Sequence, residues 1–383
     1  MTDQTANIAF IRGAMEERRD PPGSTVGFVG WVRQNLFSSI PNTLLTLFSI
    51  YIMWVVLPPL IRFLFIDAVW SGAGRADCLE ENLHRAVGAC WPFVEAKFGQ
   101  FIYGFYPIDQ RWRVDITFIL GAALLVPLLV PTLPWKRENA IAFFGVFPIV
   151  AFFLLVGGHF TGLEHVETRQ WGGLLVTLVV AVTGIVVSLP LGIVLALGRR
   201  SQLPIIRFMS VIFIEFWRGV PLITVLFFAT YMLPLFMPAG WTIDGLLRAL
   251  VGVALFSAAY MAEVIRGGLQ AIPKGQNEGA MALGLGYWKM MGLIILPQAL
   301  KLVIPGIVNT FIGLFKDTTL VMIVSIFDFL GQLRAAFSDP NWSTPVTLFT
   351  GFAFAGFVYF FFCFGMSRYS LFVERRLNTG HRR

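Results

Sequence analysis

Eight apolar runs, each long enough to cross a lipid bilayer, dominate the sequence. They cover residues 40–66, 114–134, 139–157, 172–198, 208–235, 244–265, 303–327 and 345–366. A helix needs about 20 apolar residues to cross the hydrocarbon core, and it satisfies its own backbone hydrogen bonds there. The composition agrees, because 56% of the 383 residues are hydrophobic and only 13% are charged. The sequence therefore predicts an all-α, polytopic membrane protein with eight spans.

The runs divide the chain into four parts. In the part before the first run, apolar residues recur at helical spacing. This pattern predicts a short helix in the membrane interface. The parts are a cytoplasmic or interfacial segment, 1–39; an extension with three spans, 40–170, which includes a long outer loop, 67–113; a five-span core, 171–375, which includes an inner loop, 266–300; and a cytoplasmic tail, 376–383.

Lys and Arg are distributed unevenly between the two sides of the predicted membrane. If both termini are cytoplasmic, 18 of the 29 basic residues lie in inner segments and 8 in outer ones. An excess of this kind is typical of cytoplasmic loops. It predicts that both termini and the loop 266–300 face the cytoplasm. It also accounts for the excess of 29 basic over 22 acidic residues, so we expect no nucleic-acid partner.

The inner loop contains the stretch NEGAMALGLGYWKMMGLIILPQAL, which is too interrupted to form a spanning helix. A short helix is predicted from Gln276 to Leu283, with Glu278 near its start, where the helix dipole favours an acid. Two glycines then break the helix. A second short helix follows and is predicted to end at Pro297. Two short helices joined at glycine would form a rigid projection suited to docking.

The spacing of residues in this loop resembles a known motif. The residues that carry it are Glu278, Gly279, Ala280, Gly284, Ile294, Leu296 and Pro297. They match the EAA-x3-G-x9-I-x-LP loop of permease subunits of binding-protein-dependent ABC importers, except that Gly279 replaces alanine at the second position. The resemblance implies that the loop is a coupling helix, which docks on a separate ATPase subunit.

Neighbouring segments narrow the resemblance. The stretches IEFWRGVPLITVLFF and LFKDTTLVMIVSI are similar to polar and basic amino-acid permeases. The extension makes the whole chain similar to the longer permease subunit of a general L-amino acid uptake system. This family implies a bacterial inner membrane location, an amino-acid substrate and several partners. These are a second and different permease chain, two ATPase subunits that bind ATP and Mg, and a periplasmic amino-acid-binding protein.

The chain lacks the features of an enzyme. It contains no G-x-x-x-x-G-K-[ST] loop, so any ATP must be hydrolysed by a partner and this chain needs no cofactor of its own. Its 4 His residues show no metal-ligand spacing, and no catalytic set of residues stands out. The alternative to an ABC permease is a secondary transporter or channel driven by an ion gradient, which would leave the spacing of the inner loop unexplained.

Polar residues inside the spans are candidates for the substrate path. A charge at mid-bilayer costs about 2.5–3.5 kcal/mol, so it persists mainly where it faces a cavity or a partner. Lys316, Asp317 and Thr318 lie in the seventh run, and an acid beside a hydroxyl suits the ammonium group of an amino acid. The alternative is an ion pair between helices. Tyr260 and Met261 are also predicted to line the path.

Two further pairs and one loop have structural interpretations. Glu263 can meet Arg266, and Glu215 can meet Arg218, because residues three apart share a helix face. We expect both pairs to brace the inner ends of spans. Cys78 and Cys90 lie in the outer loop, where disulfides are permitted, and a disulfide between them would add about 2–4 kcal/mol of local order.

Overall fold

A computed structural model of the protein describes residues 27–159, 161–238 and 240–377, in two units. The first unit is Met1–Ala68 and the second is Val69–Arg383. Residues 1–26 of the N-terminal segment and 378–383 of the tail lie outside the described residues. Each unit is described by itself below.

The first unit holds α1 (Gly27–Asn35), α2 (Ile40–Ile61) and the π-turn η1 (Arg62–Ile66). The Ser39 hydroxyl caps α2 by accepting a hydrogen bond from the Asn42 amide at 3.4 Å. Pro58 and Pro59 lie inside α2 near its end, and the chain then widens into η1. Together α2 and η1 form one apolar span, Ile40–Ile66, which agrees with the predicted run 40–66.

The second unit is helical, apart from loops and four isolated bridges between described residues. Its α-helices are α3 (Glu80–Leu83), α4 (Trp91–Tyr103), α5 (Trp112–Leu129), α6 (Lys136–Ile141), α7 (Phe147–Val156), α8 (Gly173–Arg199), α9 (Pro204–Gly219), α10 (Leu222–Phe227), α11 (Gly245–Ala271), α12 (Lys274–Ala282), α13 (Tyr287–Met290), α14 (Leu296–Leu302), α15 (Ile304–Asp317), α16 (Phe329–Ala336) and α17 (Thr347–Leu377). Its short 3-10 and π turns are η2 (Arg75–Cys78), η3 (Ile108–Gln110), η4 (Ala142–Val146), η5 (Thr168–Gln170), η6 (Phe228–Met232), η7 (Leu233–Phe236), η8 (Met291–Ile295) and η9 (Thr318–Val324).

Seven of the eight predicted spans are continuous apolar helices in the described part of the chain. The exception is the run 208–235, which is a pair of helices separated by a sharp bend and not one continuous helix. The chain bends there by 101° between Pro204–Gly219 and Leu222–Phe236. The bend falls at Gly219, Val220 and Pro221, because a residue before proline avoids the helical region and proline cannot donate to the preceding turn.

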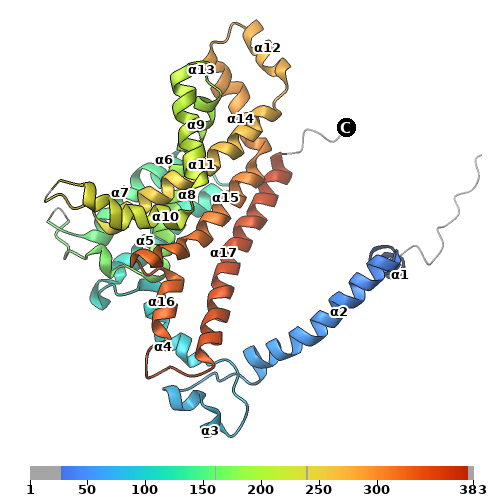
Figure 1. Cartoon of the computed structure of the whole chain (residues 1–383), viewed down its shortest axis with the longest axis vertical. Helices are drawn as coiled ribbons and strands as arrows, with labels where there is room; N and C mark the ends of the chain where they lie inside the picture. The colour runs from blue at the N-terminus through green and yellow to red at the C-terminus, as the bar shows by residue number, and fades with distance from the viewer. Residues whose placement is uncertain (1–26, 160, 239, 378–383) are drawn as a thin grey trace, which may run out of the picture. The chain divides into compact units, whose positions relative to one another are not determined.

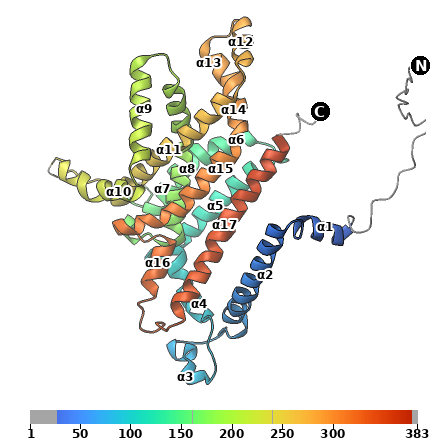
Figure 2. The same cartoon turned by 45° about the vertical axis from the view of Figure 1, so that its right-hand side comes forward.

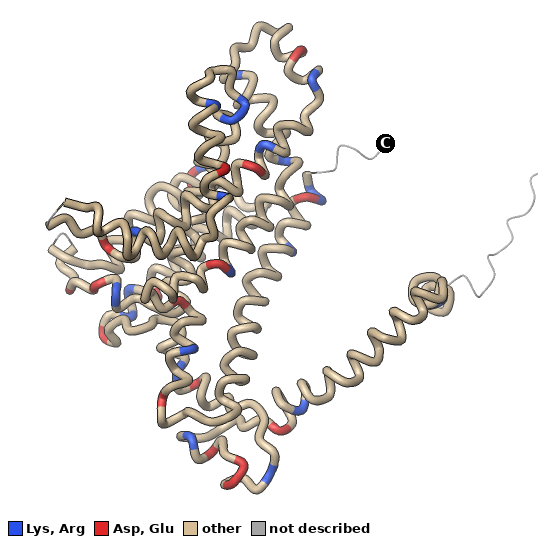
Figure 3. The backbone as a smooth tube through the Cα atoms, in the orientation of Figure 1, with Lys and Arg blue, Asp and Glu red and all other residues tan. Residues whose placement is uncertain are grey.

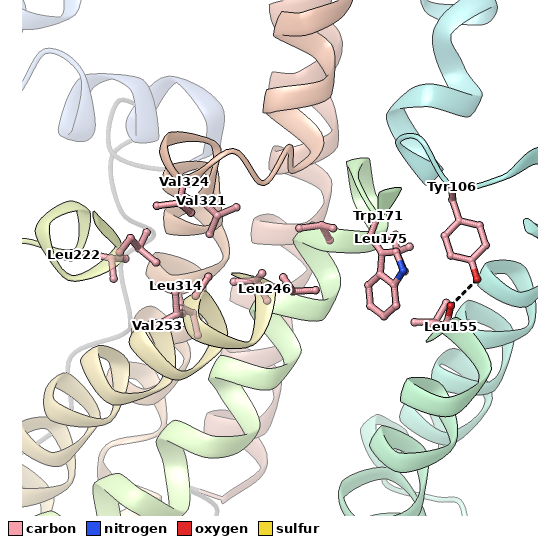
Figure 4. Close-up of a cluster of buried hydrophobic side chains, with 14 of the residues drawn as sticks. Tyr106, Leu155, Trp171, Leu175, Leu222, Leu246, Val253, Leu314, Val321 and Val324 are labelled. Atoms are coloured by element: carbon pink, nitrogen blue, oxygen red, sulfur yellow. Dashed lines mark hydrogen bonds between the residues drawn. The ribbon is translucent and has the colours of Figure 1, made fainter. Parts of the chain in front are cut away.

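The centre of the second unit is the contact between α8 and α11, which lie side by side (Figure 1). Small residues allow the close approach. A Cβ on Gly192 would lie 2.7 Å from the Met261 Cγ, and one on Gly184 would lie 2.7 Å from a Leu314 methyl. A cluster of buried apolar side chains extends from this contact to the loops at one end of the spans, where the Tyr106 hydroxyl donates to the Leu155 carbonyl at 2.8 Å (Figure 4). This packing fixes the core helices relative to one another.

Three glycines join the extension to the core. A Cβ on Gly104 would lie 2.4 Å from the Gly172 Cα, and one on Gly173 would lie 2.3 Å from the Phe101 carbonyl oxygen. Gly104 and Gly173 both have positive φ angles, of 65° and 63°. Backbone therefore packs on backbone where α4 meets the start of α8, which only glycine permits.

The second unit has two distinct ends. Both views place α12 and α13 at one end and α4 at the other, close to α16 (Figures 1 and 2). In the long helix α17 the charged residues lie toward its C-terminal end, and most of its length carries none (Figure 3). This charge distribution is the one expected of a helix that crosses a bilayer.

Candidate functional site

The inner loop folds into a projection of three short helices, residues 274–302, which we call the knob. Helix α12 ends at Ala282, and the Gly284 amide then donates to the Met281 carbonyl at 2.9 Å. Gly284 has a φ of 71°, the left-handed conformation that commonly follows a helix. The predicted helix, the break and the restart are therefore all present.

Two details of the predicted knob are wrong. Helix α12 begins at Lys274, so Glu278 lies in its second turn and cannot cap the first. The second helix does not end at Pro297 but continues through α14 to Leu302. The π-turn η8 immediately precedes this proline, and its wider ladder accommodates a residue that has no amide hydrogen.

The base of the knob is fixed to the end of α11. Ala280, Met290, Ile295 and Ala299 are buried in one apolar cluster with residues of α8 and α11. A Cβ on Gly268 would lie 2.6 Å from the Ala299 carbonyl oxygen, so α14 lies directly on α11. Within the knob, the Gln298 side-chain amide donates to the Gln276 side-chain oxygen at 3.2 Å. The knob is therefore packed directly on α11.

The outer face of the knob is apolar and exposed. Leu283 and Trp288 are 78% and 75% exposed, although both are large apolar residues. Glu278, Gly279 and Gly284 are also exposed, and a Cβ on either glycine would meet no atom within 4 Å. Ile294 and Leu296 are half-buried, whereas Pro297 is exposed. Contiguous exposed apolar surface of this kind marks an interaction site.

A cluster of ion pairs lies where α8, α9 and α11 end beside the knob. The Glu263 carboxylate accepts hydrogen bonds from the Arg266 Nε at 3.1 Å and the Nη2 at 2.9 Å, as predicted for this pair. It also lies 3.0 Å from the Nη1 of Arg199 and 3.6 Å from the Nη1 of Arg218. The predicted pair between Glu215 and Arg218 is not formed, because Glu215 contacts Arg199 instead, at 2.8 Å.

Arg199 was missed by the sequence analysis. It is the last residue of α8, and its guanidinium lies between acids of α9 and α11. The spacing of residues in the sequence indicates only ion pairs within one helix. The ion pairs of Arg199 depend on how three helices cross. In the sequence, the only notable feature of Arg199 is that it belongs to a basic inner segment. That feature indicates how the chain is oriented in the membrane and does not identify an ion-pair partner.

The predicted path residues have different environments. Lys316 is exposed and Asp317 is half-buried. Thr318 is buried, and its hydroxyl donates to the Phe315 carbonyl at 2.8 Å. Tyr260 is 39% exposed, and the guanidinium carbon of Arg218 lies 5.7 Å from the centre of its ring.

Met261 does not fit the predicted role. Its side chain is fully buried between α11 and α8, against Gly192, so it packs the core and faces no open surface.

The outer loop contains a disulfide between Cys78 and Cys90, whose Cα atoms lie 5.8 Å apart. Both residues are buried, and the Cys90 amide donates to the Thr350 hydroxyl of α17 at 2.9 Å. Nearby, Lys97 of α4 pairs with Asp339, and this contact lowers the pKa of the Asp339 carboxyl. The disulfide therefore closes a loop that is attached to the start of α17.

Reduction of this disulfide is expected to loosen the outer loop. Loss of a cross-link over a separation of 12 residues should cost about 2–4 kcal/mol of local stability. We expect Cys90→Ala and reductant to lower the midpoint of thermal unfolding of the purified complex by similar amounts, with no added effect in combination. Cys363→Ala, which removes the free cysteine of the described residues, is the control and should change nothing. Free thiols at both positions in oxidised membranes would contradict the assignment.

Asp328 is a second residue that the sequence analysis missed. It caps α16, where its carboxylate accepts from the Gly331 amide at 2.9 Å and from the Tyr359 hydroxyl at 3.2 Å. Burial raises the pKa of this carboxyl to about 6, although the backbone hydrogen bonds act in the opposite direction. The residue precedes a short helix after a span, a position at which aspartate commonly acts as a cap.

No three His, Cys, Asp or Glu side chains in residues 27–159, 161–238 and 240–377 lie close enough to hold a metal ion. Figure 3 shows that acids and bases lie mainly at the ends of the helices. The knob, the ion-pair cluster behind it and the outer loop are therefore the features from which a function can be argued.

Comparison with known proteins agrees with these features. The family described as "Binding-protein-dependent transport system inner membrane component" matches residues 188–379. The inner membrane amino-acid ABC transporter permease protein YhdY of Escherichia coli (strain K12) is 55% identical over 91% of this chain and 93% of its own. The glutamate/glutamine/aspartate/asparagine transport system permease protein BztC of Rhodobacter capsulatus is 40% identical over 98% of this chain and 100% of its own.

A solved structure described as an amino acid ABC transporter with histidines is 30% identical and covers 53% of this chain and 92% of its own, with a TM-score of 0.47. The matched family begins inside α8 and includes the whole knob. The relatives extend over the N-terminal spans as well, so the similarity is not confined to the core. The chain therefore belongs to the binding-protein-dependent inner membrane permeases and is a permease subunit of an amino-acid ABC importer, with its ATPase on a separate subunit.

Proposed function

We propose that the knob transmits ATP-driven movement to the spans by docking in a groove of the ATPase subunit. Three observations support this role. The knob presents exposed apolar side chains at the end of the second unit opposite to α4. It is packed on α11, so a push on its outer face reaches the core helices. Its residues match the EAA-like spacing from Glu278 to Pro297.

We also propose that both termini and the knob face the cytoplasm, and that the loop 67–113 faces outward. The excess of Lys and Arg in the inner segments supports this orientation. The disulfide supports it independently, because disulfides persist in the oxidising periplasm and not in the reducing cytoplasm. One orientation accounts for both observations.

We propose the following partners, which the resemblance to the longer permease subunit of a general L-amino acid uptake system supports. The importer contains a second and different permease chain, two ATPase subunits and a periplasmic amino-acid-binding protein that delivers the substrate to the outer side. The name of BztC, a relative over the full length of this chain, includes glutamate, glutamine, aspartate and asparagine. We propose polar L-amino acids of this kind as the substrates.

We propose that the substrate path passes Asp317, with Lys316 and Tyr260 beside it. Lys316 is an exposed cation within a span, and no ion pair to it occurs among the described residues. Such a charge at membrane depth faces a cavity or a partner. Thr318 contributes less than its neighbours, because its hydroxyl is already used by the Phe315 carbonyl. The cluster around Glu263 braces the three helices at the inner end of the path.

The observation that carries the proposal is the exposed and rigidly mounted knob. It is tested by purifying the tagged chain from membranes in mild detergent and identifying the proteins that accompany it. An ATPase subunit should accompany the chain in a ratio of one to one with permease subunits. A chain that purifies without an ATPase and supports uptake driven by an ion gradient in ATP-free vesicles would instead be a secondary transporter.

The Asp317→Asn variant is expected to lower amino-acid uptake by about tenfold or more. A hydrogen bond to a charged group contributes about 1.5–3 kcal/mol, and the neutral amide cannot replace it for a substrate ammonium. Uptake should be measured in proteoliposomes with the complete importer. Glu374→Gln, which neutralises a half-buried acid near the end of α17, is the control and should retain full uptake. Normal uptake of every substrate by Asp317→Asn would assign Asp317 a structural role.

A further inference from the structure

A large cavity separates the helices of the extension from the core. Its volume is about 960 Å³, and it lies between α5, η4 and α7 on one side and the first half of α8 with the start of α11 on the other. This volume is at the upper end of the range of about 300–1000 Å³ for ligand sites. The neighbouring contact between α8 and α11 is closely packed with buried side chains. The space is partly open, so a molecule from the bilayer can enter it.

The walls of the cavity are almost entirely apolar. Examples are Ala122 of α5, Phe147 of α7, Val182 of α8 and Leu250 of α11. A polar amino acid would leave its ammonium and carboxylate without partners along these walls. The same walls match a hydrocarbon chain, and each of the helical segments that form them belongs to an apolar span. The occupant is therefore a molecule with long hydrocarbon chains.

The end of the cavity beside the loop 165–171 is polar and carries charges of both signs. Glu167 and Arg169 are exposed there, and the described residues provide no ion pair for either. Asp244 also lines this end, where it accepts hydrogen bonds from Thr168 and from the Leu247 amide. A head group with one positive and one negative charge would find an opposite charge for each.

Trp171 provides a further donor at this end. Its indole is 5% exposed and lines the cavity, yet the indole nitrogen has no hydrogen-bond partner. Figure 4 shows this nitrogen on the side of the ring that faces Leu155, another residue of the cavity wall. Buried indole groups normally find a partner, and at membrane interfaces an ester or phosphate oxygen of a lipid can accept the hydrogen bond.

We propose that this cavity is a binding site for one phospholipid with an ammonium-bearing, zwitterionic head group. The acyl chains fill the apolar space between the extension and the core. The phosphate lies near Arg169, the ammonium lies near Glu167, and the Trp171 indole donates to an oxygen at the glycerol level. The lipid then takes the place of direct packing between the two groups of helices. This proposal does not depend on the role of the knob.

Photolabelling tests the site in the complete importer. The complex is reconstituted in nanodiscs that contain a trace of phosphatidylethanolamine with a diazirine in one acyl chain, then irradiated and mapped by peptide mass spectrometry. Peptides from α5, η4–α7 and the first half of α8 should be labelled more strongly than peptides from α2, a span that contributes no residue to the cavity wall. Equal labelling of all bilayer-facing helices would show bulk lipid only and would overturn the proposal.

Two competitions sharpen this test. Unlabelled phosphatidylethanolamine should remove the label at about a tenfold lower fraction than phosphatidylglycerol, and equal competition would overturn the choice of a zwitterionic head group. Ala122→Trp with Val182→Trp should lower labelling of the site by about tenfold, because the indoles occupy the cavity. Ala123→Trp is the control, because Ala123 is the neighbouring residue of α5 and does not line the cavity. This variant should be labelled as strongly as the unaltered protein. If the variant with both substitutions is folded and its labelling is unchanged, the lipid binds elsewhere. If the variant fails to fold, the distribution of label over the helices of the unaltered protein decides the proposal.

Discussion

Replacing Gly284 with valine is expected to abolish most ATP-driven uptake while the chain remains inserted in the membrane. Gly284 has a φ of 71°, and a Cβ there would meet no atom within 4 Å. The cost therefore arises from backbone conformation alone, about 1–2 kcal/mol for an ordinary residue and more for a β-branched one. The turn between α12 and α13 would relieve this strain by changing its conformation, and the exposed face of the knob would no longer fit its partner. Gly284→Asn is the matched control, because asparagine tolerates the left-handed conformation.

The same experiment includes a change of charge. Glu278 is exposed on the knob, so Glu278→Lys should weaken a contact with a basic groove, whereas Glu278→Gln should have a smaller effect. The measurements are retention of the ATPase subunit through purification and stimulation of ATP hydrolysis by the loaded binding protein. Full retention and full stimulation in Gly284→Val and Glu278→Lys would refute the coupling role of the knob.

The Gly104→Ala variant is expected to destabilise the second unit strongly, although it adds only one methyl group. Gly104 has a φ of 65° and a ψ of −128°, a conformation nearly restricted to glycine. Its new Cβ would lie 2.4 Å from the Gly172 Cα, which is backbone and cannot rotate away. Backbone strain and the enforced shift together should cost about 3 kcal/mol or more. We expect a large loss of folded protein in detergent. The loss is measured by fluorescence-detected size-exclusion chromatography and by thermal unfolding.

Alanine variants at two other glycines distinguish backbone strain from steric collision as the cause of this loss. Gly158 has a φ of 112° but open space around its Cβ position, so Gly158→Ala tests strain without collision. At Gly99 the nearest atom is the Nη1 of Arg111, at 2.8 Å, the end of a flexible side chain, so Gly99→Ala tests contact without strain. Both should be milder than Gly104→Ala. Equal stability of all three variants would mean that the joint between α4 and α8 contributes little to the fold.

Most of the helices could be predicted from the sequence, because the bilayer imposes one rule on every span. The apolar runs located every continuous span, but α11 and α17 extend to Ala271 and Leu377, well beyond the predicted ends at residues 265 and 366. The same rule failed at Pro221, where the hydropathy of the run 208–235 hides a bend of 101°. A separate prediction, that the second knob helix ends at Pro297, is also wrong, because the helix continues to Leu302. Both errors concern proline, whose effect depends on the backbone geometry around it.

The candidate site was less accessible to sequence analysis, because its contacts join different helices. The pair Glu263 and Arg266 lies within one helix and was predictable from spacing. Arg199 reaches Glu215 and Glu263 only through the crossing of three helices, which no spacing encodes. The left-handed Gly284 was predictable because a glycine followed a short helical pattern. The cap of α16 by Asp328 depends on a loop whose course the sequence does not specify.

The mounting of the knob on α11 makes this helix a lever. It runs unbroken for 27 residues, which corresponds to a length of about 40 Å. Ile265 and Leu269 lie under the knob at one end, and Asp244 caps the other end beside Thr168. A tilt of about 5° at the knob would therefore displace the far end by about 3 Å, roughly the length of a hydrogen bond. A stiff helix thus converts a small rotation on one side of the membrane into a displacement large enough to break contacts on the other.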